Sequence, residues 1–192
     1  MTSRLAARRY VSIVLRDDAT CRGGVTAVAA WAGRHSFHVD QPLIVSDGVE
    51  LGQALEHLRL TRRDILHIET HGPEPDFNPD WAFVLIGGDY LDPAEAFPGG
   101  LGLHPMLAIL GPCYAGGDAG RQAIHHLFRP ATWVISCAGY ATVEQVENRV
   151  LPALDAIDEY GLPKTGGALP PGVQTALGRQ NGRWSMRQVE PL

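Results

Sequence analysis

Two residues of this chain, Cys113 and His71, have the types and positions that nucleophilic catalysis requires. A cysteine thiol becomes a nucleophile when a base or an electropositive setting favours its thiolate, and an imidazole can supply the base. Cys113 lies within the turn 111–117, directly after the apolar run 106–110, and His71 closely follows a second apolar run, residues 65–68. Open α/β sheets place their chemistry beyond the carboxyl ends of strands, so the sequence predicts that both side chains lie there.

Four short apolar runs predict the strands that would position these residues: 10–15, 64–69, 107–110 and 132–136. Runs this short and this apolar are typical of a parallel sheet that is covered on both faces. Helical patterns lie between them, and one more strand is expected over residues 37–45. The expected helices cover residues 23–31, 51–60 with Ser46 or Asp47 as N-cap, 121–128 capped by Asp118, and 143–157 capped by Thr142. This alternation predicts an α/β fold with a mostly parallel sheet.

One segment between the two candidate strands breaks the alternation. Residues 81–86, the turn Gly87-Gly88-Asp89 and residues 90–91 predict a small β-hairpin, followed by a helix start at Asp92-Pro93. The chain from Gly161 onward is rich in Gly and Pro, so we expect loop there and one short helix over residues 173–179. The length of 192 residues favours a single domain over residues 1–192, with 161–192 as a C-terminal extension.

Composition narrows the function classes. Hydrophobic residues make up 45% of the chain and charged residues 19%, which is ordinary for a globular protein. The net charge of −5 gives no support for nucleic-acid binding. No apolar run approaches the ~20 residues of a membrane-spanning helix, and the N-terminus lacks the pattern of a signal peptide. Three cysteines cannot all pair within one chain, so we expect reduced thiols and a cytoplasmic protein without membrane partners.

Simpler interpretations apply to most of the other cysteines and histidines. Cys21 and Cys137 are expected to be buried and inert, because cysteine commonly packs as a small apolar residue. The histidines interpreted in the same structural way are His35, His38, His57 and His104. His125 and His126 are expected to be partly exposed on a helix.

Two other chemistries would also use Cys113. His67 and Glu69 with Pro112-Cys113 approach the H-x-E … P-C-x-x-C pattern of zinc deaminases, but position 116 is Gly, so one zinc ligand is missing. Residues 111–115 also approximate a nucleophile elbow. Hydrolases with that elbow take their histidine from much later in the chain, whereas the only later histidines here lie in the next expected helix.

The order of the elements resembles the caspase-like superfamily of cysteine peptidases, clan CD, and most closely its bacterial CHAT-type members. The resemblance rests on residues 64–72, which end in His71-Gly72, and on residues 106–117, which contain Cys113. The intervening hairpin, the strand 132–136 and the helix from Thr142 extend it over roughly residues 64–158. One departure is Gly111-Pro112, where many members of the family have Asp or Ser-Ala.

The resemblance implies a three-layer caspase-like sandwich, with the hairpin inserted between the two strands that carry His71 and Cys113. It implies a cytoplasmic cysteine endopeptidase in which Cys113 is the nucleophile and His71 the general base and acid. The backbone N–H groups of Gly72 and Cys113 would form the oxyanion hole. Such a peptidase needs no metal or organic cofactor and acts on a protein or peptide. The bacterial members also suggest a role in defence and a regulatory protein partner.

Substrate preference is expected to depend on the loop 16–22. Asp17 or Asp18 would select a basic residue before the cut, whereas Arg16 or Arg22 would select an acidic one. The adjacent aspartates favour the basic choice, and the alternative is that these charges only solvate a turn. The rival to a peptidase is a non-catalytic caspase-like interaction module that docks through residues 161–192.

Overall fold

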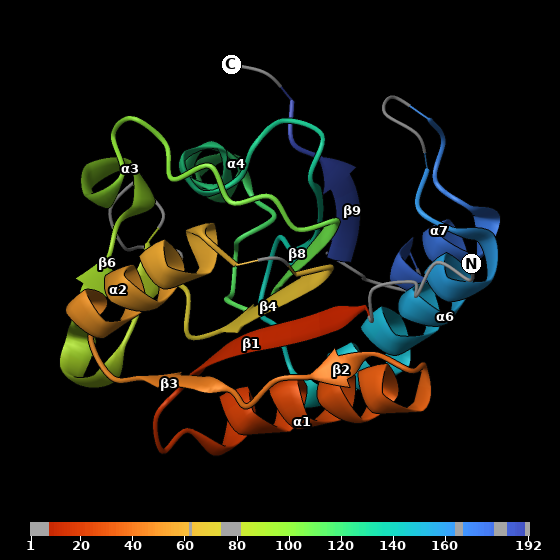
Figure 1. The fold of residues 1–192 in the computed structure, drawn as a ribbon, viewed down its shortest axis with the longest axis horizontal. Coiled ribbons are helices and arrows are strands. Elements are labelled where there is room, and N and C mark those ends of the chain that lie inside the picture. Colours follow the sequence, from red (N-terminus) through yellow and green to blue (C-terminus); the bar gives the residue numbers. More distant parts are fainter. Residues whose placement is uncertain (1–7, 62, 74–81, 164–166, 179–183, 191–192) are drawn as a thin grey trace, which may run out of the picture.

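A sheet whose strands are all parallel, apart from the last, organises the chain (Figure 1). The structure is a computed structural model and describes residues 8–61, 63–73, 82–163, 167–178 and 184–190. The strands of this sheet are β1 (Arg9–Leu15), β2 (His38–Val39), β3 (Leu43–Val45), β4 (Ile65–Glu69), β7 (Leu107–Leu110), β8 (Trp133–Cys137) and β9 (Trp184–Gln188). Their order is β2-β1-β4-β7-β8-β9, and β3 also pairs with β1.

Helices cover both faces of the sheet and give three layers (Figure 1). One face packs against α2 (Gly48–Arg59) and α4 (Asp118–Leu127), and the short α3 (Pro93–Ala96) lies beside α4. The other face packs against α1 (Ala19–Arg34), α7 (Pro171–Gly178) and a continuous helical stretch. That stretch consists of α5 (Val143–Gln145), the π-helical segment η2 (Val146–Val150) and α6 (Leu151–Tyr160). The prediction of an α/β fold with a mostly parallel, covered sheet is therefore confirmed.

The strand β7 shows why its sequence is apolar throughout. Leu107 and Ile109 belong to the core under α1 and α7, whereas Ala108 and Leu110 belong to the core under α2 and α4. Successive side chains of a strand point to opposite faces, so a strand that is covered on both faces needs no polar alternation.

The expected strands at residues 10–15, 64–69, 107–110 and 132–136 are all present, with ends shifted by at most one residue. Two of the predicted helix caps are also confirmed. Asp47 accepts a hydrogen bond from the backbone N–H of Glu50 at 2.8 Å, and Thr142 accepts one from Gln145 at 3.2 Å. Capping side chains satisfy N–H groups that the first turn of a helix leaves without partners.

Three local predictions were wrong. The single strand expected over residues 37–45 is two short strands, β2 and β3, that pair with different parts of β1 and flank Pro42. Asp118 is the first helical residue of α4, and the cap position belongs to Gly117. The first helix starts at Ala19 instead of residue 23, because Asp18 caps it.

The C-terminal extension contributes to the core. The sequence predicted only loop and one short helix there. That helix is α7, whose Val173 is fully buried; the predicted end at Arg179 lies outside the described residues. After it, β9 pairs antiparallel with β8, and its Trp184 and Met186 are buried against α7 and η2. The described parts of 161–192 are therefore built into the sandwich.

The predicted hairpin is present as β5 (Phe83–Val84), the 3₁₀ turn η1 (Ile86–Gly88) and β6 (Tyr90–Leu91), with the two strands antiparallel. Gly87 and Gly88 have φ angles of 72° and 82°, a region that glycine adopts without steric cost. Trp81, the first residue of the predicted hairpin, lies outside the described residues.

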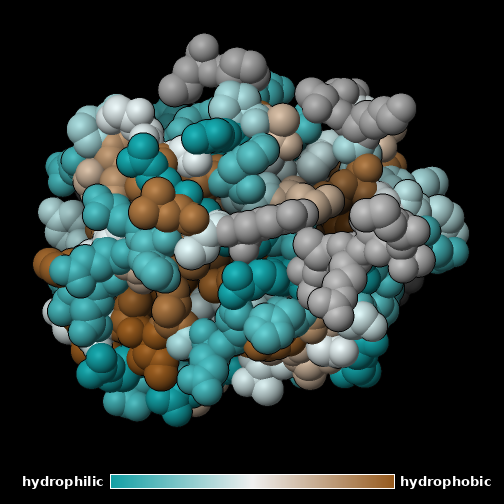
Figure 2. Space-filling view, in the orientation of Figure 1, coloured by the Kyte–Doolittle hydropathy of each residue, from teal (hydrophilic) through white to brown (hydrophobic). Residues whose placement is uncertain are grey.

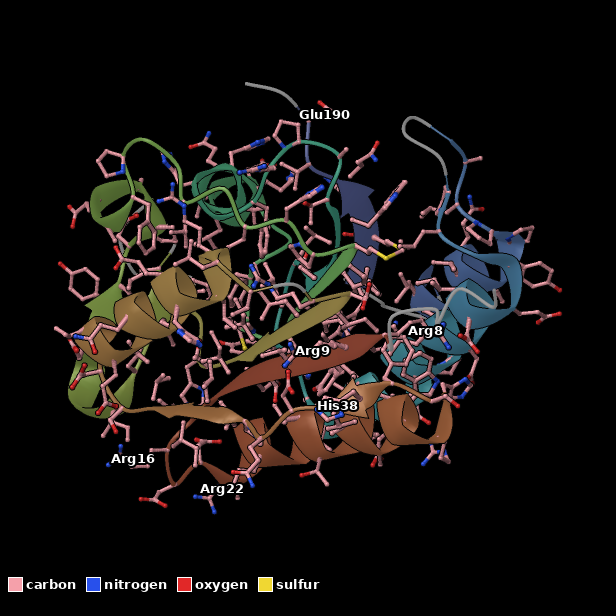
Figure 3. All side chains as sticks on the ribbon, in the orientation of Figure 1. Arg8, Arg9, Arg16, Arg22, His38 and Glu190 are labelled. Carbon is pink, nitrogen blue, oxygen red and sulfur yellow. The ribbon has the colours of Figure 1, made fainter. Side chains whose placement is uncertain are left out.

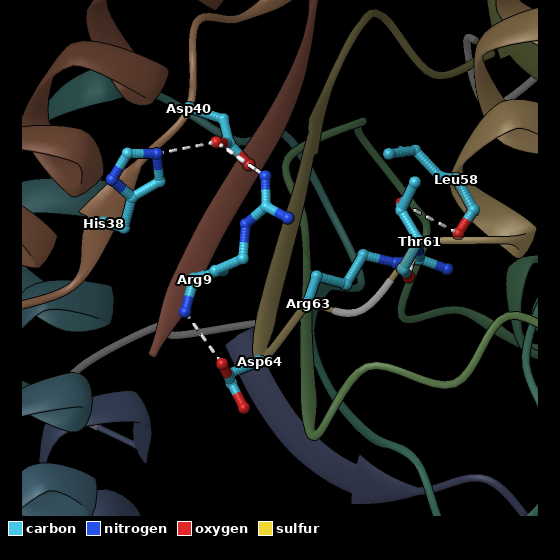
Figure 4. Close-up of polar contacts among 7 residues, drawn as sticks. All are labelled: Arg9, His38, Asp40, Leu58, Thr61, Arg63 and Asp64. Carbon is cyan, nitrogen blue, oxygen red and sulfur yellow. Dashed lines mark hydrogen bonds and ion pairs between the residues drawn. The ribbon is translucent and has the colours of Figure 1, made fainter. Parts of the chain in front are cut away.

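Hydrogen bonds and an ion pair lie at the amino ends of β1 and β4 (Figure 4). The backbone N–H of Arg9 donates to Asp64 Oδ2 at 2.7 Å, and the Arg9 guanidinium pairs with both carboxylate oxygens of Asp40 at 2.8 and 2.9 Å. Arg63 beside them is almost fully buried, and burial lowers its pKa to about 10. Ion pairs therefore occupy this edge, and the candidate catalytic residues lie at the opposite, carboxyl edge.

The face shown in Figure 2 is mostly polar, and an apolar patch lies over β3 and the start of α2 at its lower left. Ile44 of β3 and Val49 of α2 are 53% and 69% exposed. Within the described part of the chain, no helix has both the length and the apolar character needed to cross a bilayer.

Candidate functional site

His71 is held at the carboxyl end of β4 by the hairpin. Its backbone N–H donates to the carbonyl oxygen of Val84 at 3.2 Å, and the N–H of Val84 donates to the carbonyl oxygen of His71 at 3.0 Å. The side chain is 48% exposed. The hairpin thus fixes the backbone of the candidate base and leaves its ring accessible to a substrate.

The imidazole of His71 is oriented by Asp18. Its Nε2 lies 2.9 Å from Asp18 Oδ2, and the other carboxylate oxygen accepts the backbone N–H of Cys21 at 2.8 Å. Burial alone would raise the pKa of the Asp18 carboxyl, but the hydrogen bonds from Cys21 and His71 lower it overall. The Asp18 carboxylate therefore occupies the Nε2 side of the ring.

Cys113 follows β7 in a tight turn that is bound to the loop after β8. Tyr114 has a φ of 60°, an uncommon conformation for a residue with a side chain. Its N–H donates to Gly139 at 2.9 Å, and the N–H of Gly116 donates to Cys137 at 2.8 Å. The N–H of Ala141 points at the Cys113 sulfur, 3.4 Å away. The Cys113 sulfur therefore has a backbone N–H donor within the turn.

The segment His71-Gly72 packs directly on the backbone of Cys113. A side-chain carbon at position 72 would collide with the Cys113 carbonyl oxygen and lie 2.8 Å from its amide nitrogen. This approach follows from the sheet, because β4 and β7 are neighbours in parallel register, with Ile68 opposite Leu110. The structure thus places Gly72, a predicted oxyanion donor, against the backbone of Cys113, the predicted nucleophile.

A buried polar chain runs beneath this edge and accounts for Gly111. The hydroxyl of Tyr10 lies 2.9 Å from Nδ1 of His67, and Nε2 of His67 lies 2.7 Å from Glu69 Oε2. A Cβ atom at Gly24 would lie 2.8 Å from Glu69 Oε1, and one at Gly111 would overlap the same carboxylate. Position 111, before Pro112, is therefore glycine because the Glu69 carboxylate occupies the space that a side chain would need.

The same chain bears on the zinc-deaminase alternative. His67 is fully buried and both of its ring nitrogens have hydrogen-bonding partners, so neither is directed at Cys113. A zinc-ligating histidine keeps one nitrogen for the metal. The pattern that favoured this alternative belongs to an internal hydrogen-bond network.

The loop that the sequence predicts for substrate selection is shorter than expected, because residues 19–22 belong to α1. Asp17 has a φ of 55° and a side chain that is 80% exposed, and it pairs with Arg22 at 2.9 Å. Arg16 and Arg22 lie at the edge of the molecule in Figure 3, where Arg16 approaches Glu50 at 3.6 Å. Asp18 is bound to His71, so a preference for basic residues through this loop would depend on Asp17.

Cys21 is buried, as predicted, and it also lies beside this site, which sequence reasoning did not predict. It lies three residues after the cap Asp18, and its sulfur comes within 4.8 Å of both the Asp18 carboxylate and the His71 ring. Burial raises the pKa of the Cys21 thiol, and the charges of Glu69 and Asp18 raise it further. The available signal was Asp18 as a helix cap, which would have placed Cys21 in the first turn beside the end of β4. Cys137, as predicted, is buried.

Comparisons with models of protein families and with curated proteins gave no match for this chain.

Proposed function

We propose that this chain is a cysteine peptidase that hydrolyses peptide bonds with Cys113 as nucleophile and His71 as general base and acid. The observation that carries the proposal is the packing of His71-Gly72 on the backbone of Cys113 at the carboxyl edge of the sheet. Acyl transfer needs a thiol and a base, and here the thiol and the imidazole follow adjacent strands. Gly72 leaves the space beside them free of a side chain.

The chemistry follows from the positions of these groups. His71 takes the proton of the Cys113 thiol, and the thiolate attacks the carbonyl carbon of the scissile bond. The N–H groups of Gly72 and Cys113 stabilise the oxyanion, and position 72 lacks a side chain that would obstruct the carbonyl. His71 then protonates the leaving amine. A water molecule, deprotonated by His71, releases the acyl group and restores the thiol.

Asp18 adds a third member to this arrangement. A carboxylate that accepts the Nε2–H of a histidine keeps the lone pair on Nδ1 and stabilises the imidazolium once it forms. Since Asp18 is held by the N–H of Cys21 at the start of α1, its own position is fixed independently of His71. It is therefore a positioning residue in the proposed mechanism.

The rival hypothesis, a non-catalytic caspase-like interaction module, relied on residues 161–192 as a docking segment. In the described part of that segment, α7 and β9 pack into the core and pair with β8. This packing gives the described part of the segment a structural role, so a docking role is not needed to explain it. We therefore prefer the peptidase to the interaction module.

The test uses a positional-scanning peptide library and a peptide that carries an electrophilic ketone. The chain should cleave a subset of the library and bind the ketone at Cys113. Cys113→Ala should abolish both, and His71→Ala should slow both by at least ~100-fold. Cys137→Ser, which removes a buried thiol outside the dyad, is the matched control. Ketone adducts on Cys21 or Cys137 in place of Cys113, or cleavage that persists in Cys113→Ala, would contradict the proposal.

A further inference from the structure

Three side chains from two elements converge beside the candidate dyad: Asp18 and Cys21 at the start of α1, and His71 after β4. A carboxylate oxygen, the thiol sulfur and a ring nitrogen all lie within 4.8 Å of one another. In the described part of the chain, no other group of three or more His, Cys, Asp or Glu residues offers this convergence. The proposed hydrolysis uses His71 and Asp18 but has no use for Cys21.

The donor set is the one that zinc prefers. Zn²⁺ binds thiolate, imidazole and carboxylate, with bonds of about 2.0 to 2.3 Å and ligands often spaced C-x₂₋₄-C along the chain. Asp18 and Cys21 have two residues between them, and His71 comes from a distant segment, as ligands outside such a pair usually do. Tetrahedral angles at those bond lengths require ligand separations of about 3.3–3.7 Å, so the atoms must move by roughly 1 Å.

The surroundings permit that movement and favour a cation. Asp18 Oδ2 and His71 Nε2 are already 2.9 Å apart, and the half-exposed ring of His71 can adjust without disturbing the core. The Glu69 carboxylate lies close enough to Cys21 to act on its charge, which adds negative potential from the buried side. The neighbouring cation Arg22 is directed at Asp17.

We propose that Asp18, Cys21 and His71 bind one Zn²⁺ ion, and that the bound ion holds the peptidase inactive. The second half rests on the proposed function; the first half does not. Binding converts the Cys21 thiol to a thiolate and releases one proton to solvent. Zinc takes the Nε2 lone pair of His71, so the ring proton resides on Nδ1. A ring in that state cannot accept the proton of Cys113, and the thiolate needed for attack does not form.

The binding test uses the full chain with Cys113→Ala, which removes the candidate nucleophile from the readout. Zinc chloride is titrated in competition with a chromogenic chelator, and cobalt(II) is added separately to record the thiolate-to-metal absorption. One equivalent should bind, and the thiolate band should appear. A Cys21→Ser change should weaken zinc binding at least 10-fold and remove the band. His71→Ala should also weaken zinc binding at least 10-fold. Cys137→Ser should change neither. If the Cys113→Ala protein binds zinc equally tightly with and without the added Cys21→Ser change, the proposed site is wrong.

The inhibition test uses the chain with Cys113 intact. Zinc should stop peptide cleavage and slow the alkylation of Cys113, a chelator should restore both, and the Cys21→Ser protein should need at least 10-fold more zinc for half-inhibition. Loss of cleavage on chelation would overturn the inhibitory role. The two proposals can fail separately. Zinc binding that depends on Cys21, without any peptide cleavage, would refute the peptidase and leave the zinc site. Peptide cleavage with zinc binding that does not depend on Cys21 would refute the zinc site alone.

Discussion

Gly72 and Cys113 approach each other so closely that position 72 has no room for a side chain. The atom that a Cβ would meet is the backbone carbonyl oxygen of Cys113, with the amide nitrogen 2.8 Å away. Backbone atoms cannot swing aside as the end of a flexible side chain can. Any residue other than glycine would therefore push apart the strand end that carries His71 and the turn that carries Cys113.

Gly72→Ala should lower peptide cleavage by at least ~100-fold, which is the loss expected when one oxyanion donor is displaced. Its matched control is Gly33→Ala. Gly33 lies in α1, and a methyl group added there would have no atom within 4 Å, so alanine should raise the free energy of unfolding by about 0.5–1 kcal/mol through helix propensity. Urea unfolding and cleavage assays on both variants check this. Full activity of Gly72→Ala would show that the close approach has no catalytic role.

Asp18→Asn should preserve the start of α1, because asparagine is as good an N-cap as aspartate. It should nevertheless lower kcat by roughly 10-fold or more, since the amide no longer fixes the tautomer of His71. Asp47→Asn is the matched control, because Asp47 caps α2 in the same way without contacting His71. If Asp18→Asn instead raises KM only for substrates with a basic residue before the cut, Asp18 selects substrate as the sequence predicted.

The overlap between Glu69 and any side chain at position 111 predicts a strong coupling between the two positions. Gly111→Ala should cost about 1–3 kcal/mol by overpacking. Glu69→Ala should cost about 1–3 kcal/mol because it leaves His67 without its acceptor. The double variant should lose at least ~1 kcal/mol less than the sum, since each change relieves part of the other. Denaturant unfolding of the four proteins gives the coupling, and additive costs would contradict the geometry.

Asp158 should make stability depend on pH at the acid end. Hydrogen bonds from His35 Nδ1 and Arg8 Nη1, 2.9 and 2.7 Å long, lower its pKa below the ordinary 3.8. A carboxyl whose pKa is lower in the folded state stabilises the fold above its unfolded pKa and loses that contribution as the pH falls through its folded pKa. The stability difference between the native chain and Asp158→Asn should therefore shrink as the pH falls below 3.8. A difference that persists unchanged to the acid limit would contradict the assignment.

The strands and two of the helix caps could be predicted from the sequence because local physics decides them. A short, continuous apolar run such as Leu107–Leu110 is typical of a strand in a sheet that is covered on both faces. The strand β9 escaped prediction for the opposite reason: it alternates Trp184 and Met186 with polar residues and follows a segment rich in Gly and Pro. It is a strand only because β8 offers a free edge.

The candidate dyad could be predicted because both residues follow strands, but Asp18 and Cys21 could not. Their importance depends on β1 lying next to β4, a pairing of segments more than 50 residues apart. The charges around residues 16–22 indicated a site without indicating that Asp18 would point at His71. Sequence patterns identify residues that end strands, whereas the order of the strands decides which of those ends meet.

The position of β9 also has a consequence for the order in which the fold is completed during synthesis. The turn that carries Cys113 is hydrogen-bonded to the loop after β8, and β8 is flanked on its outer side by β9. Among the strands that the structure describes, β9 leaves the ribosome last. Until β9 arrives, β8 presents an open edge and lacks the packing of Trp184 and Met186. A nascent chain therefore holds all the residues of the proposed dyad before it holds the support that fixes their spacing.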